Sequence, residues 1–169
     1  VIVPALAFTS CSADDENPID LKTEIVGNWK WQNQELKGLE ALEGTDYEGY
    51  IETIKGLLTT YSPYKKDVVV GFKDDTDKTL TLSGGGVSQE GTYEIKNNKT
   101  IITKLGDDGV AGLDAEYTAA INGNELTMTM SNDFIKQAIS SFPSLELPEA
   151  MVNLLLKTFK FSIIFEKVQ

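Results

Sequence analysis

The feature that most constrains the fold is a period-two alternation of apolar and polar residues that runs through the middle of the chain. Strict alternation over four to eight residues is typical of a β-strand with one face buried and the other in water. Short segments rich in Gly, Asn and Asp separate the alternating runs. The pattern predicts strands at Asp67–Lys73, Lys78–Ser83, Gln89–Lys96, Lys99–Leu105, Ala115–Asn122 and Asn124–Ser131.

Two further strands lie at the ends of the alternating region. Near the start, Glu24–Gln34 is predicted to be a strand that carries Trp29, Trp31 and Asn33 on one face. At the end of the chain, apolar residues again fall on every second position, and they are Phe159, Phe161, Ile163 and Phe165. The predicted strands number eight, and tight turns join many of them. Asn97-Asn98 and Asn122-Gly123 indicate such turns, because these residues tolerate the left-handed backbone that short hairpins need.

Helical periodicity interrupts this pattern twice. Between the first two strands, Asp46–Thr59 has apolar residues three and four positions apart, with a Thr45/Glu48 pair that resembles a capping box and a proline, Pro63, beyond its end. Before the last strand, a second helical face is followed by a further helix opened by Pro148. The apolar residues of that second face are Phe134, Ile135, Ala138, Ile139 and Phe142.

Together these elements predict a mainly β fold, an eight-stranded antiparallel up-and-down barrel with a helix after strand 1 and a helical hairpin before the last strand. Closing the sheet removes the exposed edges that an open sheet of short strands would leave. A chain of 169 residues suits one domain with a single core.

Short motifs on these strands carry a family resemblance. Gly27-Asn28-Trp29 matches the Gly-x-Trp signature of lipocalins. The sequence patterns that begin at Glu90 and at Tyr117 resemble those of the lipocalin-like outer-membrane lipoproteins of Bacteroidota. The resemblance covers most of residues 20–168. It implies that the tryptophan closes one barrel end beneath an arginine of the last strand. This chain has no arginine, so Lys160 or Lys167 takes that place or the contact is lost.

The single cysteine, Cys11, lies where an apolar run gives way to an acidic stretch. The pairing resembles a bacterial lipoprotein processing site, which implies a truncated signal peptide at residues 1–10, a lipidated tether at 11–19 and a barrel domain at 20–169. Several acyl chains on one cysteine would hold the protein at a membrane. The acidic residues Asp14, Asp15 and Glu16 either resemble the signal that exports such lipoproteins to the outer face of the outer membrane or form a solvated linker.

Composition excludes several classes of function. With 26 acidic against 15 basic residues and a formal charge of −11, nucleic acid is not an expected partner. Histidine is absent, which removes Ser-His and Cys-His nucleophile pairs and the commonest zinc ligand. The acidic loops Asp74–Asp77 and Asp107-Asp108 lack the spacing of a calcium loop. We therefore expect no enzyme activity, no catalytic residue, no metal and no cofactor.

The inward face of the strands carries the functional hypothesis. It combines large apolar residues with Tyr93 and Tyr117 as polar groups, Met128 beside them, and Trp31 near the mouth, which together suit a small apolar ligand. In the alternative, the same side chains simply fill the barrel, and the protein is a structural or accessory subunit of an outer-membrane assembly that docks through its helical insert. The expected inward residues are Leu80, Leu82, Tyr93, Ile95, Ile101, Tyr117, Ile121, Leu126, Met128, Met130, Phe159, Phe161, Ile163 and Phe165.

Overall fold

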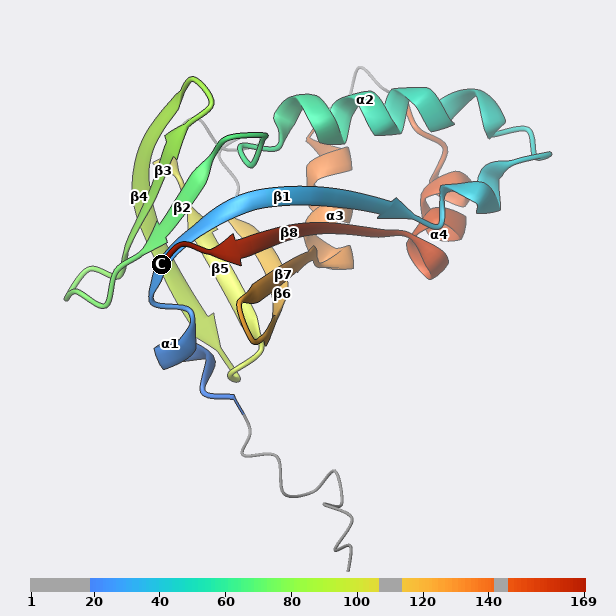
Figure 1. The fold of residues 1–169 in the computed structure, drawn as a ribbon. Helices are drawn as coiled ribbons and strands as arrows, with labels where there is room; N and C mark the ends of the chain where they lie inside the picture. Colours follow the sequence, from blue (N-terminus) through green and yellow to red (C-terminus); the bar gives the residue numbers. More distant parts are fainter. Residues whose placement is uncertain (1–18, 107–113, 142–145) are drawn as a thin grey trace, which may run out of the picture.

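The computed structural model describes residues 19–106, 114–141 and 146–169, and it is a closed antiparallel barrel. Each strand pairs with the next along the chain, and the last pairs with the first, so the predicted up-and-down topology is confirmed (Figure 1). The strands are β1 Gly27–Lys37, β2 Val69–Phe72, β3 Thr79–Gly84, β4 Val87–Lys96, β5 Thr100–Lys104, β6 Ala115–Asn122, β7 Glu125–Met130 and β8 Lys160–Lys167.

The first strand departs from strict alternation at a β-bulge. Trp31 pairs with Phe165, but the next paired residue of β1 is Asn33, which lies opposite Ile164. The extra residue, Gln32, shifts the side-chain parity, because successive side chains point to opposite faces. The prediction that Asn33 shares the face of the two tryptophans is therefore wrong, and Asn33 is exposed.

The tight turns follow the predicted chemistry. Asn97 and Asn98 have φ values of 51° and 54°, the left-handed conformation that a two-residue hairpin requires and that asparagine tolerates. Gly123 has a φ of 59° in the hairpin between β6 and β7. These turns fix the register, which is continuous along both hairpins.

The helical segment after β1 begins later than predicted. It opens with a 3-10 turn at Glu48–Tyr50 and continues as α2, Ile51–Tyr61. The predicted capping box is wrong, because neither the 3-10 turn nor α2 has a side-chain cap. Thr45 and Glu48 instead stabilise the preceding turn: the Thr45 hydroxyl accepts a hydrogen bond from the Tyr47 amide at 3.1 Å, and the Glu48 carboxylate accepts one from the Gly44 amide at 3.0 Å. In Figure 1 the helix runs alongside β1.

Two helices precede the last strand, α3, Asn132–Ser140, and α4, Glu149–Thr158. Of the predicted apolar face of α3, Phe134 and Ile135 are buried and Ala138 and Ile139 pack against the core, while Phe142 lies outside the described residues. A 3-10 helix at Leu39–Leu42, which the sequence did not predict, packs against α4.

A short helix that the sequence also did not predict, α1 at Leu21–Glu24, closes one end of the barrel (Figure 1). Its Leu21 and the following Ile25 are buried. Asn98 ties this segment to the β4–β5 hairpin, since its side-chain oxygen accepts from the Leu21 amide at 2.7 Å and its side-chain nitrogen donates to the Ile19 carbonyl at 2.6 Å. We call this the α1 end of the barrel.

The Gly-x-Trp signature lies at the α1 end. Trp29 is fully buried, and its indole nitrogen donates a 2.7 Å hydrogen bond to the Ile25 carbonyl. Gly27 has a φ of 129°, a backbone conformation that strongly favours glycine. The ammonium of Lys167 lies 5.2 Å from the centre of the Trp29 ring, a cation–π contact. Of the two lysines considered, Lys167 is the one that lies against the Trp29 ring.

The inward face agrees closely with the expected one. All but one of the fourteen expected residues are buried, and the exception, Ile95, is half-buried and packs against the core. Val70 and Phe72 of β2 complete the wall. None of the helices in the described ranges is long and apolar enough to cross a membrane.

Candidate ligand-binding site

The barrel end opposite α1 gathers buried polar groups from several elements. β2 runs antiparallel to β1 and therefore starts far from α1, so Tyr64, five residues before β2, lies at this opposite end. β5 starts beside the Asn97-Asn98 turn at the α1 end, so Thr103, its penultimate residue, lies toward the same opposite end. We call this the Tyr64 end of the barrel.

Tyr64 is the most informative side chain in this region. It is 1 % exposed, and its ring makes edge-to-face contacts with Tyr117 and Phe165 at centroid distances of 6.0 Å and 5.5 Å. Its hydroxyl has no hydrogen-bond partner among the described residues. A buried hydroxyl usually has one, because water that it loses on folding must be replaced. Burial raises the pKa of Tyr64 to about 12, so the hydroxyl is a neutral donor at physiological pH.

Thr103 provides a second buried hydroxyl close by. It is 2 % exposed and shares the inward face of β5 with Ile101. Its hydroxyl lies within hydrogen-bonding reach of the Tyr64 hydroxyl, and this contact lowers the pKa of Tyr64 against the larger effect of burial. The two hydroxyls nevertheless do not meet the geometry of a hydrogen bond, and the Thr103 oxygen also lacks a partner within the described part of the chain. The two hydroxyls therefore lie near each other, and neither is satisfied by a hydrogen bond of standard geometry among the described residues.

Trp31 adds a third donor. It is half-buried, but its indole nitrogen is buried and has no hydrogen-bond acceptor among the described residues. Its register partner is Phe165, the ring that Tyr64 contacts, and its amide donates to the Val68 carbonyl at 2.9 Å. Trp31 therefore belongs to the same end as Tyr64, at the point where β1 separates from β2 and the ring is partly accessible to solvent.

Two of the predicted site residues line the wall beside these donors. Tyr117 is 2 % exposed, and burial, with the neighbouring Tyr64 hydroxyl as the second cause, holds its pKa well above the ordinary value. Met128 is fully buried and pairs with Ala119 of β6, one inward position along from Tyr117. The structure thus brings Trp31, Tyr117 and Met128 to one continuous inward face.

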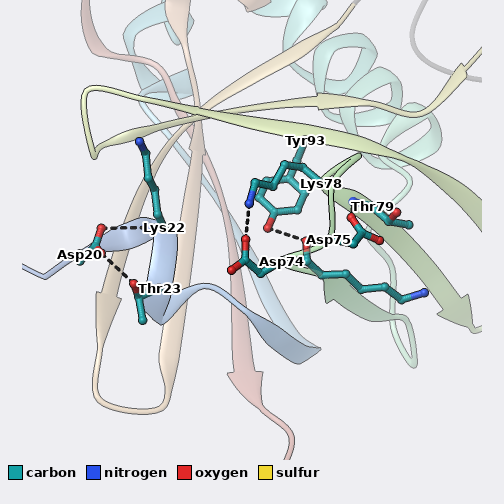
Figure 2. A network of polar contacts seen from close by, with 9 residues as sticks. Asp20, Lys22, Thr23, Asp74, Asp75, Lys78, Thr79 and Tyr93 are labelled. Atoms are coloured by element: carbon teal, nitrogen blue, oxygen red, sulfur yellow. Dashed lines mark hydrogen bonds and ion pairs between the residues drawn. The ribbon is translucent and has the colours of Figure 1, made fainter.

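Tyr93 does not join them through its hydroxyl. Although it is the register partner of Thr103, its hydroxyl donates a 2.9 Å hydrogen bond to the Lys73 carbonyl at the β2–β3 turn. Its ring packs edge-to-face on Phe72 at 5.1 Å. Figure 2 shows Tyr93 beside Asp74 and Lys78 of that turn. The expected role of Tyr93 as a polar group for a ligand is therefore replaced by a structural one, because its donor is already used.

Two carboxylates of the acidic β2–β3 turn have partners within the turn region. The Asp74 carboxylate pairs with the Lys78 ammonium (Figure 2), and the Asp75 carboxylate accepts a 2.7 Å hydrogen bond from the Thr79 amide. Hydrogen bonding from Thr79, first from its side chain and then from its amide, lowers the pKa of Asp75. In the described part of the chain, no three acidic or cysteine side chains are grouped as metal ligands. Asp107 and Asp108 lie outside it.

The sequence analysis missed two members of this site. Thr103 could have been found, because it continues the inward parity of Ile101 in a strand that was correctly predicted. Tyr64 could not, since it follows Ser62-Pro63 in a segment with no periodicity and is placed by the tertiary fold alone. Cys11, the predicted lipidation site, lies outside the described residues.

A separate open depression of about 480 Å³ follows the outer face of α3. It is lined by side chains of polar residues, most of them exposed, but most of the surface that faces it comes from their apolar atoms; these residues are Asp133, Lys136, Gln137, Ser140 and Ser141. Large exposed hydrophobic residues in the described ranges are Ile19 and Val168, neither of which belongs to α3 or α4.

A comparison of the chain with models of known protein families and with curated proteins found no match. The fold and the arrangement of the side chains are therefore the grounds for a functional proposal.

Proposed function

We propose that this chain is a non-enzymatic, surface-tethered lipoprotein whose lipocalin-like barrel binds a small, largely apolar ligand at the Tyr64 end. The observation that carries the proposal is the set of buried donors without partners on Trp31, Tyr64 and Thr103. They lie in a wall of apolar side chains that includes Tyr117 and Met128. An apolar pocket with a few convergent polar groups is the usual form of a small-molecule site.

The two ends of the barrel differ in a way that supports this assignment. At the α1 end, Trp29 and Asn98 use their polar groups in hydrogen bonds within the protein. That end also receives the segment that precedes α1, where the lipid anchor is expected at Cys11. A tether at the α1 end would leave the Tyr64 end facing away from the membrane and open to a ligand.

The electrostatics at the Tyr64 end favour binding over catalysis. Buried polar side chains in the described residues are Ser62 and Thr103, with no buried carboxylate or lysine beside them. A nucleophile or general base requires a neighbouring base or a lowered pKa. Burial instead raises the pKa values of Tyr64 and Tyr117, which makes their hydroxyls less reactive.

The proposal is tested by titrating the purified chain with Nile red, a neutral dye whose fluorescence rises in apolar surroundings. The wild type is compared with a Tyr117→Ala/Met128→Ala variant, which alters the inward wall. A Thr118→Ala/Thr127→Ala variant is the matched control, because these residues of β6 and β7 have the opposite, outward parity.

We expect saturable dye binding by the wild type and the control, a changed affinity in the inward variant, and little effect of high salt, since the charges lie outside. If the wild type does not bind dye, or if all three proteins bind it equally, binding inside the barrel is refuted. The alternative, docking through the helical insert, would then be the better account. The depression on α3 would then be the candidate docking surface.

A further inference from the structure

The three donors without partners define the chemistry of the group that they would bind. An indole N–H can only donate, so the nitrogen of Trp31 requires an acceptor. The hydroxyls of Tyr64 and Thr103 can each donate or accept; they lie close enough together for Thr103 to lower the pKa of Tyr64, but neither has a partner of hydrogen-bond geometry among the described residues. A single acceptor atom that receives one or more of these hydrogen bonds would satisfy groups that the protein leaves unsatisfied.

The charges of the protein distinguish between anionic and neutral hydrogen-bond acceptors. No lysine is buried in the described part of the chain, and the whole chain carries a formal charge of −11. A carboxylate or phosphate in this environment would lose its hydration without gaining a cation, which is strongly unfavourable. A neutral acceptor, such as the oxygen of a ketone, ester, amide or ether, loses far less hydration. It gains the same hydrogen bonds.

We infer that the Tyr64 end recognises an uncharged hydrogen-bond acceptor, most simply a carbonyl oxygen, on an otherwise apolar small molecule, through the donors of Tyr64, Thr103 and Trp31. The inference rests on the proposed function. It adds that the uncharged acceptor of the ligand determines which apolar molecules bind most tightly. The apolar wall gives general affinity for hydrophobic molecules, whereas the donors discriminate between molecules of equal size.

Three ligands of matched shape separate these contributions: 2-acetylnaphthalene, which carries a ketone, 2-ethylnaphthalene, which lacks the acceptor, and 2-naphthoate, which is an anion at neutral pH. Their dissociation constants are measured by calorimetry or by displacement of Nile red from the purified chain. We expect the ketone to bind about tenfold more tightly than the hydrocarbon, because buried donors left without partners are costly. The anion should bind more weakly than the ketone.

A Tyr64→Phe/Thr103→Val variant removes both hydroxyls while keeping the side-chain volumes nearly unchanged. We expect it to lose most of the preference for the ketone while it binds 2-ethylnaphthalene as well as the wild type does. Tyr93→Phe is the matched control, because it removes a tyrosine hydroxyl that already donates to the Lys73 carbonyl. This control should keep the full preference.

The outcomes distinguish this inference from the proposed function. If no naphthalene binds, both are refuted. If the ketone and the hydrocarbon bind the wild type equally, or if the preference survives in the double variant, ligand binding stands but recognition by these donors is wrong. Tightest binding of 2-naphthoate would likewise overturn the inference. Equal affinities would also result if an ordered water molecule held the donors.

Discussion

Replacing Tyr64 by phenylalanine should stabilise the ligand-free protein. The hydroxyl is buried and has no partner among the described residues. A buried polar group left in that state costs about 1–3 kcal/mol, and removal of the hydroxyl recovers part of this cost while the ring keeps its contacts with Tyr117 and Phe165. We expect the free energy of unfolding to rise by about 1 kcal/mol, which corresponds to a rise in Tm of about 2–4 °C for a domain of this size.

The same chemical change at Tyr93 provides the control. The Tyr93 hydroxyl donates a 2.9 Å hydrogen bond to the Lys73 carbonyl, so Tyr93→Phe should lower the free energy of unfolding by about 1 kcal/mol. Both variants and the wild type are refolded from urea, which removes any ligand acquired during expression, and their unfolding curves are compared. If Tyr64→Phe destabilises the protein as much as Tyr93→Phe does, then the Tyr64 hydroxyl has a partner in solution and the argument for the site fails.

Three further predictions concern the anchor, the α1 end and alkaline pH. Expressed with its full leader, a Cys11→Ala variant should leave the membrane fraction on cell fractionation; retention as firm as that of the wild type would contradict lipidation. Trp29→Ala should cost about 3–5 kcal/mol in urea unfolding, because it empties a fully buried site and breaks the bond to the Ile25 carbonyl, whereas a loss within about 0.5 kcal/mol would contradict its role. Because folding raises the pKa of Tyr64 from 10.0 to about 12, the unfolded chain ionises at lower pH than the folded protein. The free energy of unfolding should therefore be full below about pH 10 and fall between pH 10 and 12, and it should fall less steeply in Tyr64→Phe.

The sequence predicts most of the barrel because its information is local. Period-two alternation and the Asn97-Asn98 turn determine which residues face inward and which strands are neighbours, and the structure confirms both. The parity of β1 is predicted only up to the bulge at Gln32, where an extra residue shifts the pairing without any Gly or Pro to mark it. The helix α1 was missed because its four residues are too few to show a period.

The candidate site is predicted less completely, because it depends on which polar groups find partners. Tyr93 and Tyr117 have the same inward parity and the same chemistry, so the sequence treats them alike. The fold separates them, since the Tyr93 hydroxyl reaches the Lys73 carbonyl and Tyr117 lies against Tyr64. Whether a hydroxyl is bonded is set by contacts between residues far apart in the chain, and periodicity carries no information about them.

The two ends of the barrel differ in whether their polar side chains have partners within the protein. At the α1 end, the Trp29 indole, the Asn98 amide and the Lys167 ammonium all have partners within the protein, as expected for groups selected to hold a structure together. At the Tyr64 end, Trp31, Tyr64 and Thr103 have none in the described residues, although phenylalanine and valine would fill the same space without the cost of burying a donor. Departures from full satisfaction are expected where a function requires them. This asymmetry favours a structural role for the α1 end, where we propose the tether, and a binding role for the Tyr64 end.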